Sequence, residues 1–285
     1  MSSLNNTLIW SGGILIEGDI ITLSHGLSIS DRHLIDQATD TRHHLHPLAE
    51  LALIQLCSQE LEVEKWKENI TRLGISSSQI RDILSFLSII GGLEVQRDLR
   101  KKVQMTIQTI SLGLLGKSFI NIATRSPATL LGISKAVFQA MNLVWITSLI
   151  TVTLIYFSGS SILSPSYLLF FLTSLYISVV IHELGHAILL SLSTSHLCTL
   201  RRGMRIAILH PPLSQKKEAL VALMGPLLGI TSSALMFLIF HHSVRSTLTL
   251  PTTVTLIILH LLSFLPWYGD GRALFTLFKT QSHAS

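Results

Sequence analysis

The chain has 285 residues, of which 48% are hydrophobic and only 13% are charged. About a quarter of the residues of an average soluble protein are charged, so this composition disfavours a wholly soluble chain and favours a membrane protein. Residues 1–96 contain six Lys/Arg against twelve Asp/Glu, a net charge of −6, whereas residues 97–285 contain fifteen against four, a net charge of +11. We therefore expect two different kinds of structure, and the acidic first part disfavours nucleic-acid binding.

The first ten residues, MSSLNNTLIW, lack the basic start and the long apolar run of a secretory signal peptide. We therefore expect no cleaved signal peptide and a cytoplasmic N-terminal domain. Cys57 and Cys198 are far apart and have neither the spacing of metal ligands nor that of a disulfide framework. Such a pair is compatible with a reducing compartment.

Residues 1–96 have the pattern of a small α+β domain. Short apolar runs predict four strands, at 8–10, 14–17, 20–23 and 32–39. Gly18-Asp19 predicts a hairpin between the second and the third. Three helices are expected to follow, over 48–57 after Pro47, over 63–73 before Gly74, and after the capping box Ser76-x-x-Gln79. Strands followed by three helices are typical of a winged helix, so we predict a winged-helix-like cytoplasmic domain.

The rest of the chain is predicted to be a multi-pass α-helical membrane protein. Residues 97–135 carry seven Lys/Arg, which predicts a basic interfacial linker against anionic headgroups. Residues 136–285 then contain four apolar segments, at 136–156, 167–193, 219–240 and 252–267. The last of them is short for a span of about 20 residues.

The distribution of Lys/Arg predicts the orientation in the membrane. Seven basic residues precede the first segment and the connection 194–218 has five, whereas 157–166 has none and 241–251 has only Arg245. Both termini and the connection 194–218 are therefore expected on the cytoplasmic side of the cell membrane. In this orientation the most polar residues of the second and fourth segments lie toward the cytoplasmic side of the membrane.

His182, Glu183 and His186 form an HExxH motif inside the second apolar segment. Two histidines four residues apart share one face of a helix and can bind one divalent metal, while the glutamate between them can act as general base. Ser174 and Ser178 extend this polar face, which predicts that it lies inside a helical bundle. The other interpretation is a pair of buried histidines bonded to neighbouring helices, but it leaves Glu183 without a partner.

A catalytic zinc site takes three protein ligands, so a third residue is required. After residue 96 the acidic candidates, besides Glu183, are Asp98 in a basic stretch, Glu218 beside two lysines, and Asp270 after the fourth segment. Asp270 is the best candidate because the glycines on both sides of it permit a tight backbone. His260, inside the fourth segment, is a competing ligand, although a buried histidine with other partners is the preferred interpretation.

Three motifs resemble those of the site-2 protease family of intramembrane metalloproteases. Residues 182–186 match its HExGH motif, and Gly225-Pro226 resembles a Gly-Pro pair of the intervening span. Residues 263–271, Ser-Phe-Leu-Pro-Trp-Tyr-Gly-Asp-Gly, resemble its Asn-x-x-Pro motif followed by Asp-Gly, and the similarity covers about 120–280. Ser263 stands where the family usually has Asn, and the Pro-to-Asp spacing is one residue short. These departures concern the substrate-clamping role of the loop more than metal binding.

The resemblance implies one Zn²⁺ per chain, held by His182, His186 and Asp270. It further implies hydrolysis of peptide bonds in or near the membrane, with zinc-bound water as nucleophile and Glu183 as general base. Residues 1–96 resemble PqqD-like leader-peptide-binding domains in the order of their elements, although no motif supports this match. That resemblance implies a precursor-peptide leader as partner, and a purely structural or dimerising role is the alternative.

The sequence thus predicts a zinc metalloendopeptidase, with residues 136–285 as its intramembrane domain, that acts on a membrane-associated protein or, in peptide maturation, on a precursor peptide. The alternative is a non-catalytic membrane protein on the same scaffold that binds peptides or assists their export. A structural metal would not need Glu183, which favours catalysis. Three more histidines, at positions 43, 44 and 46, could bind a metal, but surface positions are the preferred interpretation.

Overall fold

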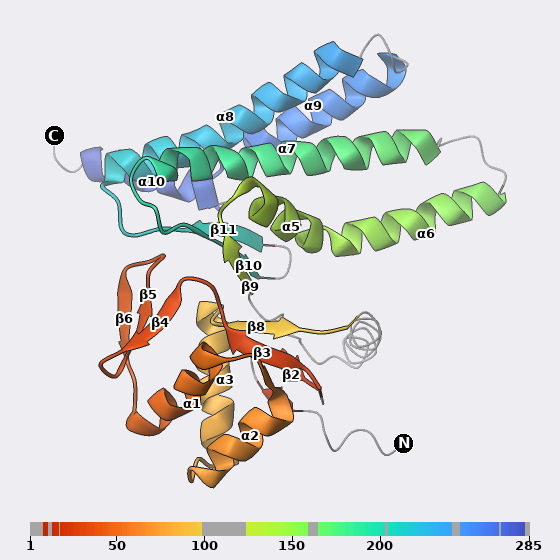
Figure 1. Cartoon of the computed structure of the whole chain (residues 1–285). Helices are drawn as coiled ribbons and strands as arrows, with labels where there is room; N and C mark the ends of the chain where they lie inside the picture. The colour runs from red at the N-terminus through yellow and green to blue at the C-terminus, as the bar shows by residue number, and fades with distance from the viewer. Residues whose placement is uncertain are drawn as a thin grey trace. The chain divides into compact units, whose positions relative to one another are not determined.

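A computed structural model describes residues 8–10, 13–16, 18–98, 124–158, 165–202, 205–240, 246–267 and 269–282 (Figure 1). The chain divides into two compact units. The first comprises 1–126 with 200–205, and the second comprises 127–199 with 206–285.

The strands of the first unit form small antiparallel sheets. β1 (Leu8–Trp10) pairs with β2 (Gly13–Leu15), and β3 (Ile20–Leu23) lies between β7 (Leu61–Glu62) and β8 (Leu93–Gln96). β4 (Leu27–Ser30), β5 (His33–Asp36) and β6 (Thr41–His44) form a meander in that order. The four strands predicted from the sequence correspond to β1, β2, β3 and β5, whereas the other strands were not anticipated.

The hairpin predicted at Gly18-Asp19 is wrong, because β2 and β3 belong to different sheets. Asp19 is completely buried and accepts a hydrogen bond of 2.9 Å from the backbone N–H of Ile16. Arg97 donates two further hydrogen bonds of 2.8 Å to the same carboxylate. The chain therefore turns at Asp19 around a charged contact instead of continuing a two-stranded ladder.

Three helices follow, as predicted: α1 (Pro47–Ser58), α2 (Val63–Arg72) and α3 (Ser77–Ile90). The capping box at Ser76 and Gln79 is confirmed, with hydrogen bonds in both directions. Trp66 of α2 is fully buried and donates its indole N–H to the carbonyl oxygen of Ala52 in α1 at 3.0 Å. The helices and sheets enclose an apolar core that includes Leu15, Ile21, Leu34, Leu53, Ile70, Ile80 and Leu87.

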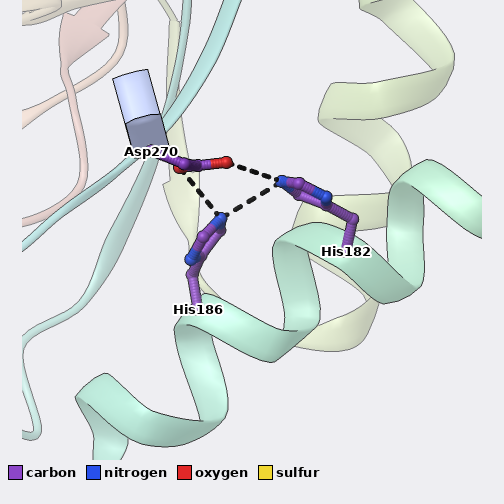
Figure 2. Close-up of side chains that lie close together, drawn as sticks. All are labelled: His182, His186 and Asp270. Carbon is purple, nitrogen blue, oxygen red and sulfur yellow. Dashed lines mark hydrogen bonds and ion pairs between the residues drawn. The ribbon is translucent and has the colours of Figure 1, made fainter. Parts of the chain in front are cut away.

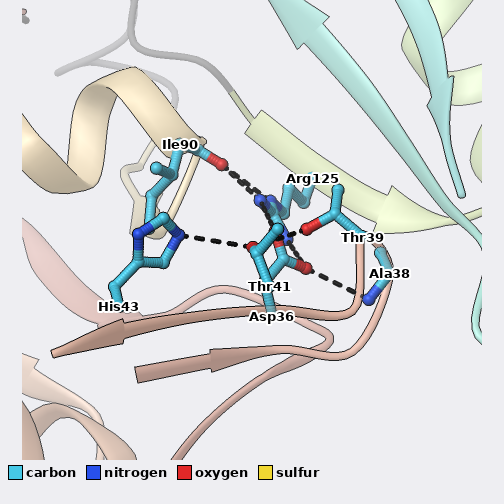
Figure 3. Close-up of polar contacts among 7 residues, drawn as sticks. All are labelled: Asp36, Ala38, Thr39, Thr41, His43, Ile90 and Arg125. Carbon is cyan, nitrogen blue, oxygen red and sulfur yellow. Dashed lines mark hydrogen bonds and ion pairs between the residues drawn. The ribbon is translucent and has the colours of Figure 1, made fainter. Parts of the chain in front are cut away.

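Arg125 in β9 (Thr124–Pro127) was predicted to belong to a basic stretch that faces lipid headgroups, but it is buried. Its guanidinium donates to both oxygens of Asp36 at 2.8 and 2.7 Å, and also to the carbonyl oxygen of Ile90 (Figure 3). Burial would raise the pKa of Asp36, but the contacts with Arg125, Thr39 and Ala38 hold this pKa below its ordinary value of 3.8. Most of the remaining predicted linker lies outside the described residues.

The second unit is mainly helical. Its helices are α5 (Leu130–Ala140), α6 (Asn142–Ser158), α7 (Pro165–Ser191), α8 (Gln215–Phe240), α9 (Ser246–Leu262) and α10 (Gly269–Ser282). The long helices α7 and α8 lie side by side, and α9 and α10 both pack on α8 (Figure 1). β10 (Cys198–Arg202) and β11 (Arg205–Leu209) follow α7 and form a hairpin in a sheet of order β11-β10-β9, and residues 200–205 of this hairpin belong to the first unit.

Two helices of the described residues are long and apolar enough to cross a membrane, over Tyr167–Ser191 and Gln215–Phe240. They correspond to the second and third predicted segments. The first predicted segment is a pair of helices bent by 54°, which counts as one more span if the pair is taken together. The fourth corresponds to α9, a shorter apolar helix of 17 residues that ends at Leu262. A membrane-associated helical unit is therefore supported, and four spans remain a prediction.

Candidate metal centre

One face of α7 is polar and buried, as its four-residue spacing predicts. Ser174, Ser178, His182 and His186 all lie on this face, and none of them is more than 9% exposed. Apolar residues of the same helix are open instead, with Leu169 64% exposed. This inversion of the usual arrangement is typical of a helix with lipid on its outer side and a polar bundle on its inner side.

The two histidines of the motif meet Asp270 from the start of α10 (Figure 2). His182 Nε2 lies 3.2 Å from one carboxylate oxygen of Asp270, and His186 Nε2 lies 3.4 Å from the other. The two Nε2 atoms are 3.2 Å apart. Within the described part of the chain, these three residues are the only group of three or more His, Cys, Asp or Glu that could hold a metal ion.

The donor atoms fit a small divalent cation. Ligands at about 2.0–2.1 Å from a tetrahedral zinc ion lie roughly 3.3 Å from one another, which matches the three separations. His186 Nδ1 is 2.8 Å from the carbonyl oxygen of Val221 and must donate to it. In the neutral ring, Nε2 therefore carries a lone pair. That lone pair faces Asp270 and the second imidazole, an arrangement that a cation stabilises.

Asp270 carries the charge that such a cation requires. Burial would raise the pKa of this carboxyl group, but its contacts with His182 and His186 hold the pKa below the ordinary value of 3.8. The carboxylate is therefore ionised at neutral pH, which is the form that binds metal.

Glu183 follows the first histidine and is partly buried. It interacts electrostatically with His182, His186 and Asp270, so it belongs to the same polar centre. Asp98 and Glu218, the other acidic residues that the sequence offered, are not in the group that could hold a metal.

Two glycines allow α8 to approach the motif closely. A Cβ at Gly185 would lie 2.9 Å from the carbonyl oxygen of Met224 and 3.1 Å from the Cα of Gly225. A Cβ at Gly225 would overlap the imidazole of His186. The close approach of the two helices also places the carbonyl of Val221 against His186, so the glycines help to fix the orientation of this ring.

The turn between α9 and α10 positions Asp270. The backbone N–H of Gly271 donates to the carbonyl oxygen of Ser263 at 3.0 Å, and the Ser263 hydroxyl donates to the carbonyl oxygen of His260 at 2.7 Å. A Cβ at Gly271 would overlap the carbonyl oxygens of Phe264 and Leu265, whereas Gly269 has open space around it. The expectation that both glycines are required is therefore supported for Gly271 alone.

His260 does not join the donor atoms, although the sequence left it as a competing ligand. Its Nδ1 lies 3.1 Å from Nδ1 of His182, and its Nε2 lies 2.5 Å from the hydroxyl oxygen of Ser178. The preferred interpretation, a buried histidine with other partners, agrees with these contacts. Sequence reasoning missed the carbonyl of Val221, because a backbone group leaves no side-chain pattern.

The three N-terminal histidines have other partners. His46 accepts a hydrogen bond from the N–H of Leu48 and caps α1, and His44 Nδ1 donates to the carbonyl oxygen of Arg32 at 3.2 Å. His43 packs edge-on against Phe86. His44 and His46 are exposed and His43 is half-buried, which agrees with the preferred interpretation of surface positions.

No model of a known protein family matches the chain, no curated protein matches its sequence, and no solved structure matches its fold. The geometry of the site and the chemistry of its residues therefore have to indicate the function.

Proposed function

We propose that the chain is an intramembrane zinc metalloendopeptidase that resembles the site-2 proteases. The observation that carries this proposal is the convergence of His182, His186 and Asp270 on the polar face of a helix long enough to cross a membrane. Three protein ligands leave one coordination position open, as catalytic zinc requires. Glu183 supplies the acid–base group that a purely structural metal site does not need.

A zinc ion held by these three residues would activate water and polarise the carbonyl group of the scissile peptide bond. Glu183 takes the proton of the attacking water and passes it to the amine that leaves, so the carboxylate is regenerated after each cycle. His182 and His186 stay neutral and present Nε2 toward the metal. Both imidazoles are buried, and burial strengthens electrostatic interactions at this site.

We further propose a multi-pass topology in which both termini and the hairpin β10–β11 lie on the cytoplasmic side. The Lys/Arg distribution supports this orientation, because the connection between α7 and α8 contains three basic residues and the first turn of α8 two more, whereas the connection between α6 and α7 contains none. His182 and Asp270 then lie toward the cytoplasmic side of the bilayer. The substrate would be a membrane-associated protein or a precursor peptide cleaved near that side.

The test is the zinc content of the full chain purified in detergent, measured by mass spectrometry for the wild type, His186→Ala and Asp270→Ala. We expect about one zinc per chain in the wild type and a loss of zinc in both variants, because each one removes a ligand. His43→Ala is the matched control and should retain its zinc. Zinc-free wild type after reconstitution would contradict the proposal. Full zinc retention in Asp270→Ala would remove the third ligand.

The first unit has a surface that suits an extended peptide, such as the leader of a precursor. β4 is an edge strand, paired only with β5 among the described strands. A groove of about 600 Å³ runs beside it, lined by Leu27, Ile29, Ile54 and Cys57, among other residues. A peptide can add a strand to such an edge and place alternate side chains in the groove.

Cys57 offers a direct test because it is exposed and lines the groove, whereas Cys198 is buried. A photo-crosslinker attached to Cys57 of the full chain should capture extended peptides from a library of defined sequences. Ile54→Asp should reduce this capture, because it adds charge to the apolar groove. Equal capture by both proteins would favour a structural or dimerising role for the unit.

A further inference from the structure

A third histidine ring lies against the proposed metal ligands. The ring of His260 of α9 lies beside that of His182, with ring centroids 5.1 Å apart and an angle of 20° between the planes. Its Nδ1 is 3.1 Å from Nδ1 of His182, on the opposite side of that ring from the metal-facing Nε2. Its other nitrogen, Nε2, is 2.5 Å from the hydroxyl oxygen of Ser178. Both nitrogens of His260 are therefore engaged away from the metal-facing atoms.

The proposed metal site determines where the protons of this chain of contacts lie. If Nε2 of His182 presents its lone pair to a metal, Nδ1 of that ring carries the proton and must donate to Nδ1 of His260. His260 then carries its own proton on Nε2 and donates to the oxygen of Ser178. Ser178 can donate in turn to the hydroxyl of Ser233 at 3.0 Å. Each hydrogen bond from His182 to Ser233 then has one donor and one acceptor.

The bundle is shaped to hold this ring. A Cβ at Gly229 of α8 would overlap the imidazole of His260, just as a Cβ at Gly225 would overlap that of His186. The two glycines are four residues apart, so they lie on one face of α8 and each leaves room for one histidine. Only about 6% of His260 is exposed, so the ring lies inside the bundle together with these groups.

We propose that His260 is a positioning residue of the metal site. It accepts the Nδ1 proton of His182, fixes the orientation of that ring and directs its Nε2 lone pair to the metal, while Ser178 holds His260 in the matching tautomer. The carbonyl of Val221 does the same for His186. The proposal rests on the metal site proposed above and assigns a role to a residue outside its ligands. Partners of this kind typically contribute ten- to a hundredfold to metal affinity.

The experiment compares zinc affinity and the cobalt spectrum in the full chain purified in detergent, for the wild type, His260→Phe and His260→Asn. Phe keeps an aromatic ring at this position but accepts no hydrogen bond, so we expect zinc affinity to fall about ten- to a hundredfold, with one zinc per chain still bound at saturation. The visible absorption of bound Co²⁺ should change as well. The amide oxygen of Asn stands near the position of Nδ1, so His260→Asn should recover part of the affinity.

Leu256→Ala is the matched control, because Leu256 is also buried, one turn earlier on α9, and its side chain has no nitrogen or oxygen that could bond to a ligand. It should lower stability and leave zinc affinity and the cobalt spectrum unchanged. Wild-type affinity and spectrum in His260→Phe would overturn the proposal, as would a Leu256→Ala variant that weakens zinc equally. Complete loss of zinc at saturation in His260→Phe would make His260 a ligand instead. These results all require zinc in the wild type, whereas its absence there would contradict the proposed function itself.

Discussion

Each of the two units contains a group of three histidines, and the two groups differ in every respect except residue type. His43, His44 and His46 lie at an exposed corner, where they cap a helix, bind a carbonyl and pack on a phenyl ring. The histidines of α7 and α9 are buried, and two of them direct Nε2 toward the same carboxylate. Burial and convergence, rather than the number of histidines, distinguish a candidate metal centre.

The surroundings explain this difference. The first unit has an ordinary apolar interior, with Trp66 and Leu53 fully buried, so its histidines remain at the surface. The second unit also contains a buried apolar cluster, but in addition it buries serines and histidines and leaves residues such as Leu238 and Leu154 more than 60% exposed. Buried polar groups are costly unless they are paired, so their convergence in the second unit favours a function.

The largest expected effect separates catalysis from a structural metal site. Glu183→Gln should lower the rate of peptide-bond hydrolysis by about 10²–10⁴-fold, because the amide cannot take the proton of the attacking water. Zinc content should not change, since the side chain is not among the three ligands. Cleavage is measured by mass spectrometry on single-span peptides reconstituted with the protein in liposomes.

Glu218→Gln serves as the control, because Glu218 does not belong to the metal group and should leave the rate unchanged. Hydrolysis at the wild-type rate in Glu183→Gln would remove the proposed base. A wild type that binds zinc but cleaves no peptide in the library would favour the non-catalytic peptide-binding or export-assisting alternative.

The next effect concerns the first unit. Among the described residues, its most deeply buried contact between opposite charges joins Arg125 to Asp36. Arg125→Met leaves the carboxylate buried without its partner and should lower the free energy of unfolding by about 3–5 kcal/mol. Hydrogen exchange of the α3 amides in the full chain measures this loss. Arg72→Met, which removes an exposed pair with Glu68, should have little effect. Equal effects of the two substitutions would contradict the importance of burial.

The same ion pair predicts a dependence on pH. The pKa of Asp36 in the folded protein lies below its ordinary value of 3.8. The contribution of the pair to stability is therefore fully present above that ordinary value, and it is lost as the pH falls through the lower folded-state pKa. Protection of α3 should decline over this acidic range in the wild type. In Asp36→Asn the part of the decline that this group causes should be missing, and an identical profile would contradict the assignment.

A smaller effect tests the close approach of helices in the second unit. Gly225→Ala places a methyl group where the ring of His186 lies and should weaken zinc binding about a hundredfold by displacing a ligand. Gly269→Ala is the control, because nothing lies within 4 Å of a Cβ at that position. Competition with a chromophoric chelator measures both affinities. Unchanged affinity in Gly225→Ala would show that the ring can move without cost to the metal.

The smallest expected effect tests the difference between the two histidine groups. The triple substitution of His43, His44 and His46 by Ala should leave zinc at about one per chain. Stability of the first unit should fall by about 1 kcal/mol, mainly through loss of the cap at His46. A lower zinc content in this variant would show that the exposed group binds metal after all.

Much of the fold and of the candidate site could be predicted from the sequence, and the exceptions have physical causes. The helices of the first unit are specified by local signals, such as Pro47 and the capping box at Ser76, so they agree with prediction. The predicted hairpin at Gly18-Asp19 is wrong because Asp19 pairs instead with Arg97, which is almost eighty residues away in the sequence. The burial of Arg125 was missed for the same reason, since its partner Asp36 is distant in the sequence.

The residues that can bind a metal could be recognised from the sequence alone. The spacing of His182 and His186 places them on one face of any helix, and Asp270 was one of very few acidic residues left to join them. The orientation of these groups depends on the tertiary structure, because the carbonyl of Val221 and the ring of His260 come from other helices. Local spacing follows from the geometry of a single helix, whereas contacts between helices depend on how the whole bundle packs.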